Sequence, residues 1–207
     1  MGLTQAVQMG VMTMLALSIR RNVRNPRQRI IVRGLRMRHF GKAFVAISCT
    51  VSTIALLLIP NTPLRWGWWR LMGGQGNVVL GATTETITWH TGLIGLLFVG
   101  MVLAQLPCFV LSEERDFRRG DESRTTTQRV RSSLRFGLWH MIMGIPIGAA
   151  LGLSVAGMMF SQTYLSSWRA NRSRAFAILE CTRVHLAYNM MLLFSFAAAL
   201  VLSLILS

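Results

Sequence analysis

Acidic residues are scarce in this sequence, and most of them fall in one short stretch. The chain has 207 residues with 22 Lys+Arg against 7 Asp+Glu, and five of the acids lie between Glu113 and Glu122. Glu113 and Glu114 continue an apolar segment directly, and Arg118 follows Glu114 by four residues. On a helix Glu114 and Arg118 face each other, whereas Glu113 points ~100° away. One carboxylate can therefore be held by the arginine while the other acts as a general base.

Two further polar sets occur on apolar segments. His140 follows Phe136 by four residues, and Asn189 follows His185 by four, so each pair shares a helix face. A charged residue at mid-bilayer costs ~2.5–3.5 kcal/mol, which makes such groups functional candidates. A histidine can assist a carboxylate that activates water, and a His/Asn pair can donate hydrogen bonds to an oxyanion. Taken singly, the same sets are also typical of charged helix ends and of hydrogen bonds between helices.

Metal and thiol chemistry are not indicated. Glu and His side chains could ligate Zn²⁺, but the HExxH spacing is absent, and we expect no metal and no cofactor. The cysteines are far apart without a CxxC pair, so we expect apolar packing of all three: Cys49, Cys108 and Cys181. Three other residues have no polar partner at helical spacing, and we assign them no role: His39 in a loop, His90 at a span edge and Glu85 in an outer loop.

The elements that must position these groups are membrane helices. A composition of 52% hydrophobic and 14% charged residues excludes disorder and favours one membrane-embedded domain over residues 1–207. The net charge of +15 would suit nucleic acid, but nine basic residues lie between Arg20 and Lys42 and seven between Arg115 and Arg135. Both clusters flank apolar segments, as the positive-inside rule expects, so we predict contact with anionic lipid and no nucleic-acid partner.

The predicted fold is all-α, a polytopic bundle of about five or six membrane helices. The segments are residues 1–19, 43–60, 87–111, 128–143, 147–165 and 175–206. Residues 1–19 could span the membrane or lie on it, and we favour a span. Residues 134–165 would make a helix of ~48 Å, too long for one upright span, so we break it at Gly144-Ile145-Pro146.

A glycine- and tryptophan-rich segment and a repeat of glycines predict how the helices are connected and packed. Residues 61–86 are glycine-rich and predict a loop at the membrane surface. Its tryptophans are expected in an interfacial aromatic belt: Trp66, Trp68 and Trp69. Glycines recur every four residues and predict close helix packing along one face: Gly144, Gly148 and Gly152.

In this order and on these helices, the motifs EExxxR, FxxxH and HxxxN resemble the CAAX protease and bacteriocin-processing family of intramembrane endopeptidases. The resemblance covers residues 95–200, and the first 90 residues contribute nothing to it. It implies catalytic groups that meet inside the membrane in a cavity open to the cytosol. By this resemblance Glu113 and His140 activate water, while His185 and Asn189 form the oxyanion site. Three residues are supporting: Glu114, Arg118 and Phe136.

Three hypotheses of function follow. The first is an intramembrane endopeptidase that acts on a membrane-associated protein or peptide. The second is a catalytically silent scaffold or accessory subunit of a membrane protein complex, held together by the polar residues. The third, a transporter with Glu113 in a proton relay, is disfavoured because no internal repeat is visible. The use of 21 arginines and one lysine suggests a bacterium, hence an integral protein of its cytoplasmic membrane with the basic loops and site opening on the cytoplasmic side.

Overall fold

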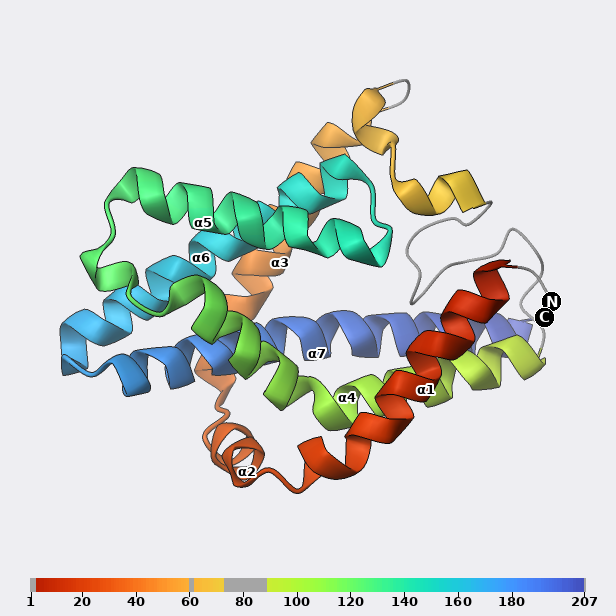
Figure 1. Cartoon of the computed structure of the whole chain (residues 1–207), viewed down its shortest axis with the longest axis horizontal. Helices are drawn as coiled ribbons and strands as arrows, with labels where there is room; N and C mark the ends of the chain where they lie inside the picture. The colour runs from red at the N-terminus through yellow and green to blue at the C-terminus, as the bar shows by residue number, and fades with distance from the viewer. Residues whose placement is uncertain (1–2, 60–61, 73–88, 207) are drawn as a thin grey trace.

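A computed structural model describes residues 3–59, 62–72 and 89–206, and every regular element in these ranges is helical. The prediction of an all-α fold is thus confirmed for the described chain. The long helices are α1 (Leu3–Val23), α2 (Pro26–Arg33), α3 (Met37–Leu57), α4 (Trp89–Arg118), α5 (Thr126–Trp139), α6 (Ile147–Asn171) and α7 (Arg174–Leu206) (Figure 1). Short 3-10 turns are η1 (Pro63–Arg65), η2 (Trp68–Met72), η3 (Asp121–Ser123) and η4 (His140–Met143).

Three of the described helical segments are long and apolar enough to cross a membrane, which is compatible with a membrane protein. They are Met37–Leu57, Gly92–Ser123 and Arg174–Leu206. The predicted total of five or six membrane helices is not supported by this criterion. Helix α5 has only 14 residues and carries arginines, while α1 and α6 are long enough but are not among the segments that are apolar enough to cross a membrane.

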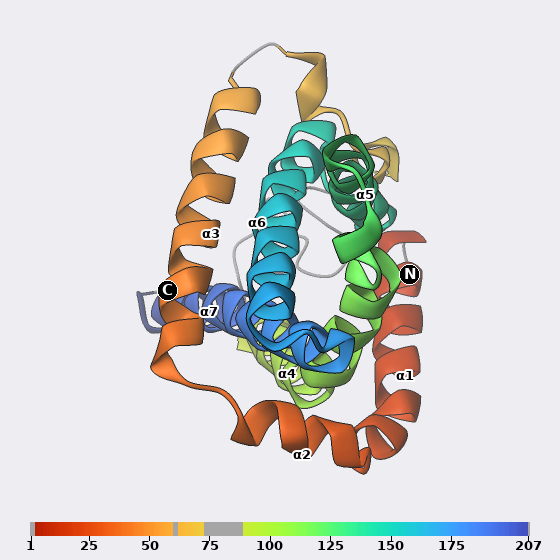
Figure 2. The same cartoon turned by 90° about the vertical axis from the view of Figure 1, so that its left-hand side faces the viewer.

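Helix α6 lies at the centre of the molecule. Figure 2 shows it between α3 and α5, with α7 crossing at its lower end. Small side chains on α6 allow this close packing. A Cβ atom on Gly152 would lie 2.3 Å from Ile54 of α3, and one on Gly137 of α5 would lie 2.2 Å from the Ala150 carbonyl oxygen of α6. The glycines therefore allow the backbones of α3, α5 and α6 to pack closely together.

The predicted break before α6 is present, but its glycine has a different role. Gly144 ends η4 with φ +79°, a left-handed conformation that glycine adopts without steric cost, and Pro146 caps the start of α6. Gly144 is thus outside the helix. Only Gly148 and Gly152 form the expected packing stripe, and both lie against α3.

Helix α4 contains Pro107 and bends about midway along its length (Figure 1). Proline lacks the backbone N–H and its ring clashes with the preceding turn, which accounts for the bend. Before it, α4 runs antiparallel to α7, with Gly92 and Gly95 against Leu204 and Leu200. After it, α4 carries the charged residues towards α5 and α6.

The segment 62–72 packs against the η4–α6 junction. Trp69 is only 1% exposed, and the indole Nε1 of Trp68 donates to the Met141 carbonyl oxygen at 2.6 Å. The prediction of an interfacial belt is therefore wrong for Trp69, because protein atoms cover its ring; Trp66 remains exposed. Glu85 and the side chain of His90 lie outside the described residues.

Candidate active site

A buried contact between a carboxylate and an imidazole joins the bent end of α4 to α7. Glu114 and His185 are 71 residues apart, yet the Glu114 Oε1 lies 2.7 Å from His185 Nδ1. The other Glu114 oxygen accepts a hydrogen bond from the Cys181 thiol at 2.8 Å and lies 3.8 Å from Arg118 Nε. Both Glu114 and His185 are almost fully buried. A buried carboxylate requires such partners, since burying it unpaired is very costly.

Arg118 is fully buried beside this pair. Its guanidinium carbon lies 5.1 Å from the centre of the Phe136 ring, and Nη1 lies 3.5 Å from the Ser133 hydroxyl. The Glu114–Arg118 contact expected from the sequence is present, although the atoms are too far apart for a direct hydrogen bond. Arg118 Nε and Nη2 have no hydrogen-bond partner in the described part of the chain.

His185 lies between two carboxylates. Its Nε2, on the opposite side of the ring from Glu114, is 3.6 Å from Glu113 Oε2. The Glu113 side chain is 32% exposed, in contrast to the 1% of Glu114. The two glutamates therefore diverge from α4 as their adjacent positions predict, and only Glu113 presents its oxygens to the exterior of the cluster.

Aromatic rings enclose the His185 imidazole. Phe160 of α6 stacks on it with centroids 4.3 Å apart and an interplanar angle of 23°. Phe136 and Tyr188 approach edge-on at 5.6 and 6.3 Å. This packing holds the ring in one orientation and lowers the local dielectric, which strengthens its contact with Glu114.

His140 also packs against Phe136. The two ring centroids are 4.8 Å apart, so one phenylalanine contacts both imidazoles. His140 Nδ1 is 2.8 Å from the Phe136 carbonyl oxygen. Because a carbonyl only accepts, Nδ1 donates this hydrogen bond, and Nε2 has no hydrogen-bond partner among the described residues. His140 is half-buried at the start of η4, where the α5 helix ends.

The structure thus brings together six of the seven residues assigned a role from the sequence. We call them the glutamate–histidine cluster: Glu113, Glu114, Arg118, Phe136, His140 and His185. Asn189 lies one turn beyond His185 on α7, and its half-buried amide makes no hydrogen bond within the described ranges. Asn189 therefore shares the expected helix face but forms no hydrogen bond with the cluster in the described part of the chain.

Sequence reasoning missed two neighbours of the cluster, Cys181 and Phe160. Cys181 precedes His185 by four residues, a spacing that could have placed both on the face that contacts Glu114. No local signal marks Phe160, because it reaches His185 from a different helix.

A second polar cluster corrects the interpretation of His39. This residue lies in the first turn of α3, not in a loop, and is only 1% exposed. Its Nε2 is 3.3 Å from Glu180 of α7, which also binds Arg38 at 2.7 Å and Arg183 at 2.6 Å. The partner was invisible in the sequence because 141 residues separate the two chain positions.

Two other acids tie the short turn η3 to α6 and α7. Buried Asp121 accepts hydrogen bonds from Ser161 and Arg124, each at 2.6 Å. Glu122 accepts from the Tyr164 hydroxyl at 2.7 Å and pairs with Arg174. Among the described residues, no group of three His, Cys, Asp or Glu side chains is arranged to hold a metal ion.

No family model, curated protein or solved structure was found to match this chain. The main indication of function is therefore the geometry of the glutamate–histidine cluster.

Proposed function

We propose that the protein is an intramembrane endopeptidase that uses a glutamate and two histidines to hydrolyse a peptide bond, as in the CAAX-protease-like family that it resembles. One observation carries the proposal. His185 is fixed by a buried carboxylate on one ring nitrogen and faces the accessible carboxylate of Glu113 on the other. A structural ion pair requires only the first of these carboxylates.

In the proposed reaction Glu113 is the general base. It takes a proton from a water molecule as the water oxygen attacks the carbonyl carbon of the scissile bond. His140, whose Nδ1 binds a backbone carbonyl and whose Nε2 has no partner in the described ranges, accepts a hydrogen bond from the same water through Nε2 and orients it. No metal is required in this scheme, since the carboxylate supplies the basic group.

His185 and Asn189 would stabilise the oxyanion of the tetrahedral intermediate. In this step Glu114 accepts a hydrogen bond from His185 Nδ1–H and holds the ring in place, while Nε2–H of the imidazolium donates to the oxyanion. The unoccupied Asn189 amide supplies a second donor. The proton taken up by Glu113 then passes to the leaving nitrogen as the C–N bond breaks, which yields a carboxylate and a free amine.

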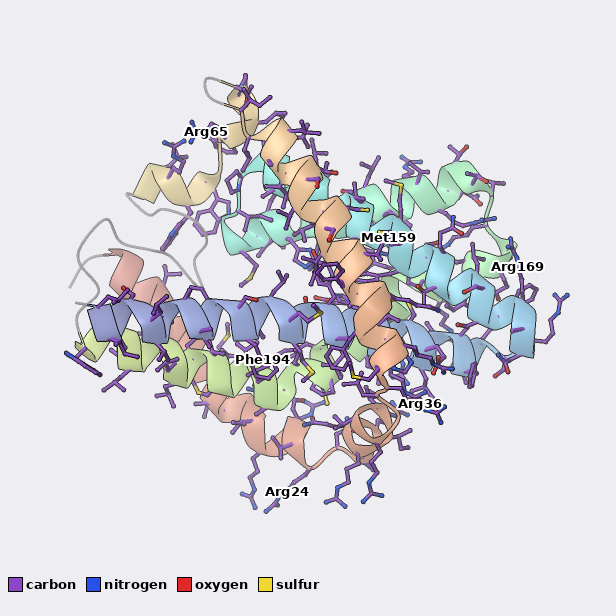
Figure 3. All side chains as sticks on the ribbon, turned by 180° about the vertical axis from the view of Figure 1, so that it is seen from behind. Arg24, Arg36, Arg65, Met159, Arg169 and Phe194 are labelled. Carbon is purple, nitrogen blue, oxygen red and sulfur yellow. The ribbon has the colours of Figure 1, made fainter. Side chains whose placement is uncertain are left out.

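The proposal includes a membrane arrangement. Helices α1, α5 and α6 would join the three candidate spans to give five or six membrane helices, with the site open to the cytoplasmic side of a bacterial membrane. The distribution of arginines supports this orientation: Figure 3 shows Arg24, Arg36 and Arg169 along the lower and right-hand edges, and Arg65 at the upper left. The substrate would be a membrane-associated peptide or protein.

The test compares three variants of the full chain reconstituted in liposomes with a pool of lipid-anchored peptides. We expect Glu113→Gln and His140→Ala to abolish the appearance of new peptide termini, detected by mass spectrometry. Asp116→Asn is the matched control, since Asp116 is an exposed acid on the same helix with no partner in the described chain. Full activity in both Glu113→Gln and His140→Ala would refute the proposal.

A non-catalytic membrane scaffold is the second candidate. One observation favours it. Three other acids connect elements of the fold and have no role in the proposed hydrolysis: Glu180, Asp121 and Glu122. The Glu114–His185 pair would then have the same purpose, and the chain would act as an accessory subunit of a membrane complex. Co-purification with a stable complex that is unaffected by Glu113→Gln, together with no cleavage by the wild type, would favour this candidate.

A further inference from the structure

A groove runs along α1 where that helix leans on α4. It has a volume of about 610 Å³, and its wall is mainly apolar, with Val11, Met14 and Leu17 from α1 and Phe109 from α4. Arg21 lines the end of the groove nearest α2. The order apolar, apolar, basic along Met14, Leu17 and Arg21 follows one face of the helix.

Hydrogen bonds between the two helices define the groove. Gln105 of α4 is fully buried, and its side-chain oxygen accepts from Ser18 at 2.5 Å and from Asn22 at 2.8 Å. Its amide nitrogen donates to the Leu15 carbonyl oxygen at 3.0 Å. These contacts hold α1 at a set position on α4, so the groove has a defined shape.

The basic end of the groove has no acidic partner. Arg20, Arg21 and Arg24 are exposed and form no ion pair within the described residues. The sequence contains no acidic residue before Glu85. Figure 3 shows the Arg24 side chain pointing away from the helices at the corner where α1 meets α2. This end of the groove is therefore a basic surface that is open to an anion from outside the chain.

The dimensions and chemistry point to a lipid. From Val11 to Arg21 the helix rises ~15 Å, which is half of the ~30 Å hydrocarbon core and so the depth of one leaflet. An arginine binds phosphate through its fork of N–H donors. We propose that the groove binds one anionic phospholipid, with an acyl chain against Met14, Leu17 and Phe109 and the phosphate on Arg21. This site is independent of the proposed peptidase activity.

The experiment is native mass spectrometry of the full chain extracted from liposomes with equal amounts of phosphatidylglycerol and phosphatidylcholine. We expect the wild type to retain phosphatidylglycerol preferentially. Arg21→Gln should weaken its retention about fivefold, the change that corresponds to ~1 kcal/mol per arginine. Leu17→Asn, a change at a side chain that is 78% exposed, should weaken it without unfolding the protein.

Two controls separate this site from general charge attraction and from free phosphate binding. Arg119→Gln removes the same charge from an exposed arginine of the other basic cluster and should leave retention unchanged. Inorganic phosphate should not displace the lipid. Equal retention of the two lipids, equal effects of Arg21→Gln and Arg119→Gln, no effect of Leu17→Asn, or displacement by phosphate would each overturn the proposal.

Discussion

At the residue scale, the site depends on two identical side chains in different surroundings. Glu113 and Glu114 are adjacent in the chain, but one is 32% exposed and the other 1%. Glu114 is committed to His185, Cys181 and Arg118, so it is unavailable to a ligand. Among the described residues, the one polar contact of Glu113 is the 3.6 Å approach to His185. Burial therefore distinguishes a carboxylate that is fixed by its partners from one that is accessible.

Glu114→Gln should be much more destabilising than Glu113→Gln. The first change leaves Arg118 as a buried charge without its counter-ion, and breaking a buried pair in this way costs about 3–5 kcal/mol. Glu113→Gln removes only a partly exposed contact and should cost less than ~1 kcal/mol. Thermal denaturation of both variants in the same detergent measures the difference. Equal stabilities would show that Glu114 is not the anchor of His185.

Local spacing predicted only part of this site. The contacts between Glu114 and Arg118 and between Phe136 and His140 follow from positions four residues apart on one helix. The Glu114–His185 pair does not, because it depends on how α4 and α7 meet in space. The roles assigned to Glu113, His140, His185 and Asn189 in catalysis stay predictions.

At the element scale, the small residues of α6 determine how near the other helices come. A Cβ atom on Gly157 would lie 3.0 Å from both Arg118 Nη2 and Phe136 Cδ1, and 3.3 Å from Ser133 Cβ. The absence of a side chain at this one position therefore makes room for two members of the glutamate–histidine cluster.

Gly157→Ala should displace Phe136 and Arg118 and disturb the cluster. We expect a loss of about 1–3 kcal/mol from overpacking, with reduced peptidase activity if the proposed function holds. Gly100→Ala is the matched control, since nothing lies within 4 Å of a Cβ at that helical position. It should be neutral or stabilising by up to ~1 kcal/mol through helix propensity. Melting temperatures of the two variants provide the test, and equal shifts would contradict the expected steric effect.

The positions of the helices could be predicted from the sequence more accurately than the contacts between them. Long apolar runs indicated α3, α4 and α7, and the glycine–proline pair indicated the break before α6, because these signals are local. Trp69 and His39 were misjudged for the opposite reason. Whether a tryptophan faces lipid or protein, and whether a histidine meets Glu180, depends on chain segments far away in the sequence.

At the scale of the whole molecule, the arginines labelled in Figure 3 lie on two different sides of the protein. Exposed arginines of α2 and of the α6–α7 turn lie at the edges that Figure 3 marks with Arg24, Arg36 and Arg169, and Arg65 lies on the other side. The apolar parts of α4 and α7 lie between them. From this distribution the positive-inside rule predicts that the edges marked by Arg24, Arg36 and Arg169 face the cytoplasm.

Cysteine reporters can test that orientation in intact bacterial cells. In a background with Cys49→Ala and Cys108→Ser, a membrane-impermeant maleimide should label Arg65→Cys in intact cells. Arg33→Cys and Arg169→Cys should be labelled only after the cells are permeabilised. All three native arginines are exposed, so the maleimide can reach each position from its own side of the membrane. The reverse pattern would place the proposed site opening outside the cytosol.

The number of residues between the bend at Pro107 and the paired glutamates is itself a structural requirement of α4. Each residue added to a helix turns everything beyond it by ~100° and moves it by ~1.5 Å. One residue inserted between Pro107 and Glu113 would swing Glu114 away from His185 and turn Arg118 out of its buried position. This segment should therefore accept many single substitutions but no insertion or deletion, whereas the turn between α6 and α7 has no such restriction from the cluster.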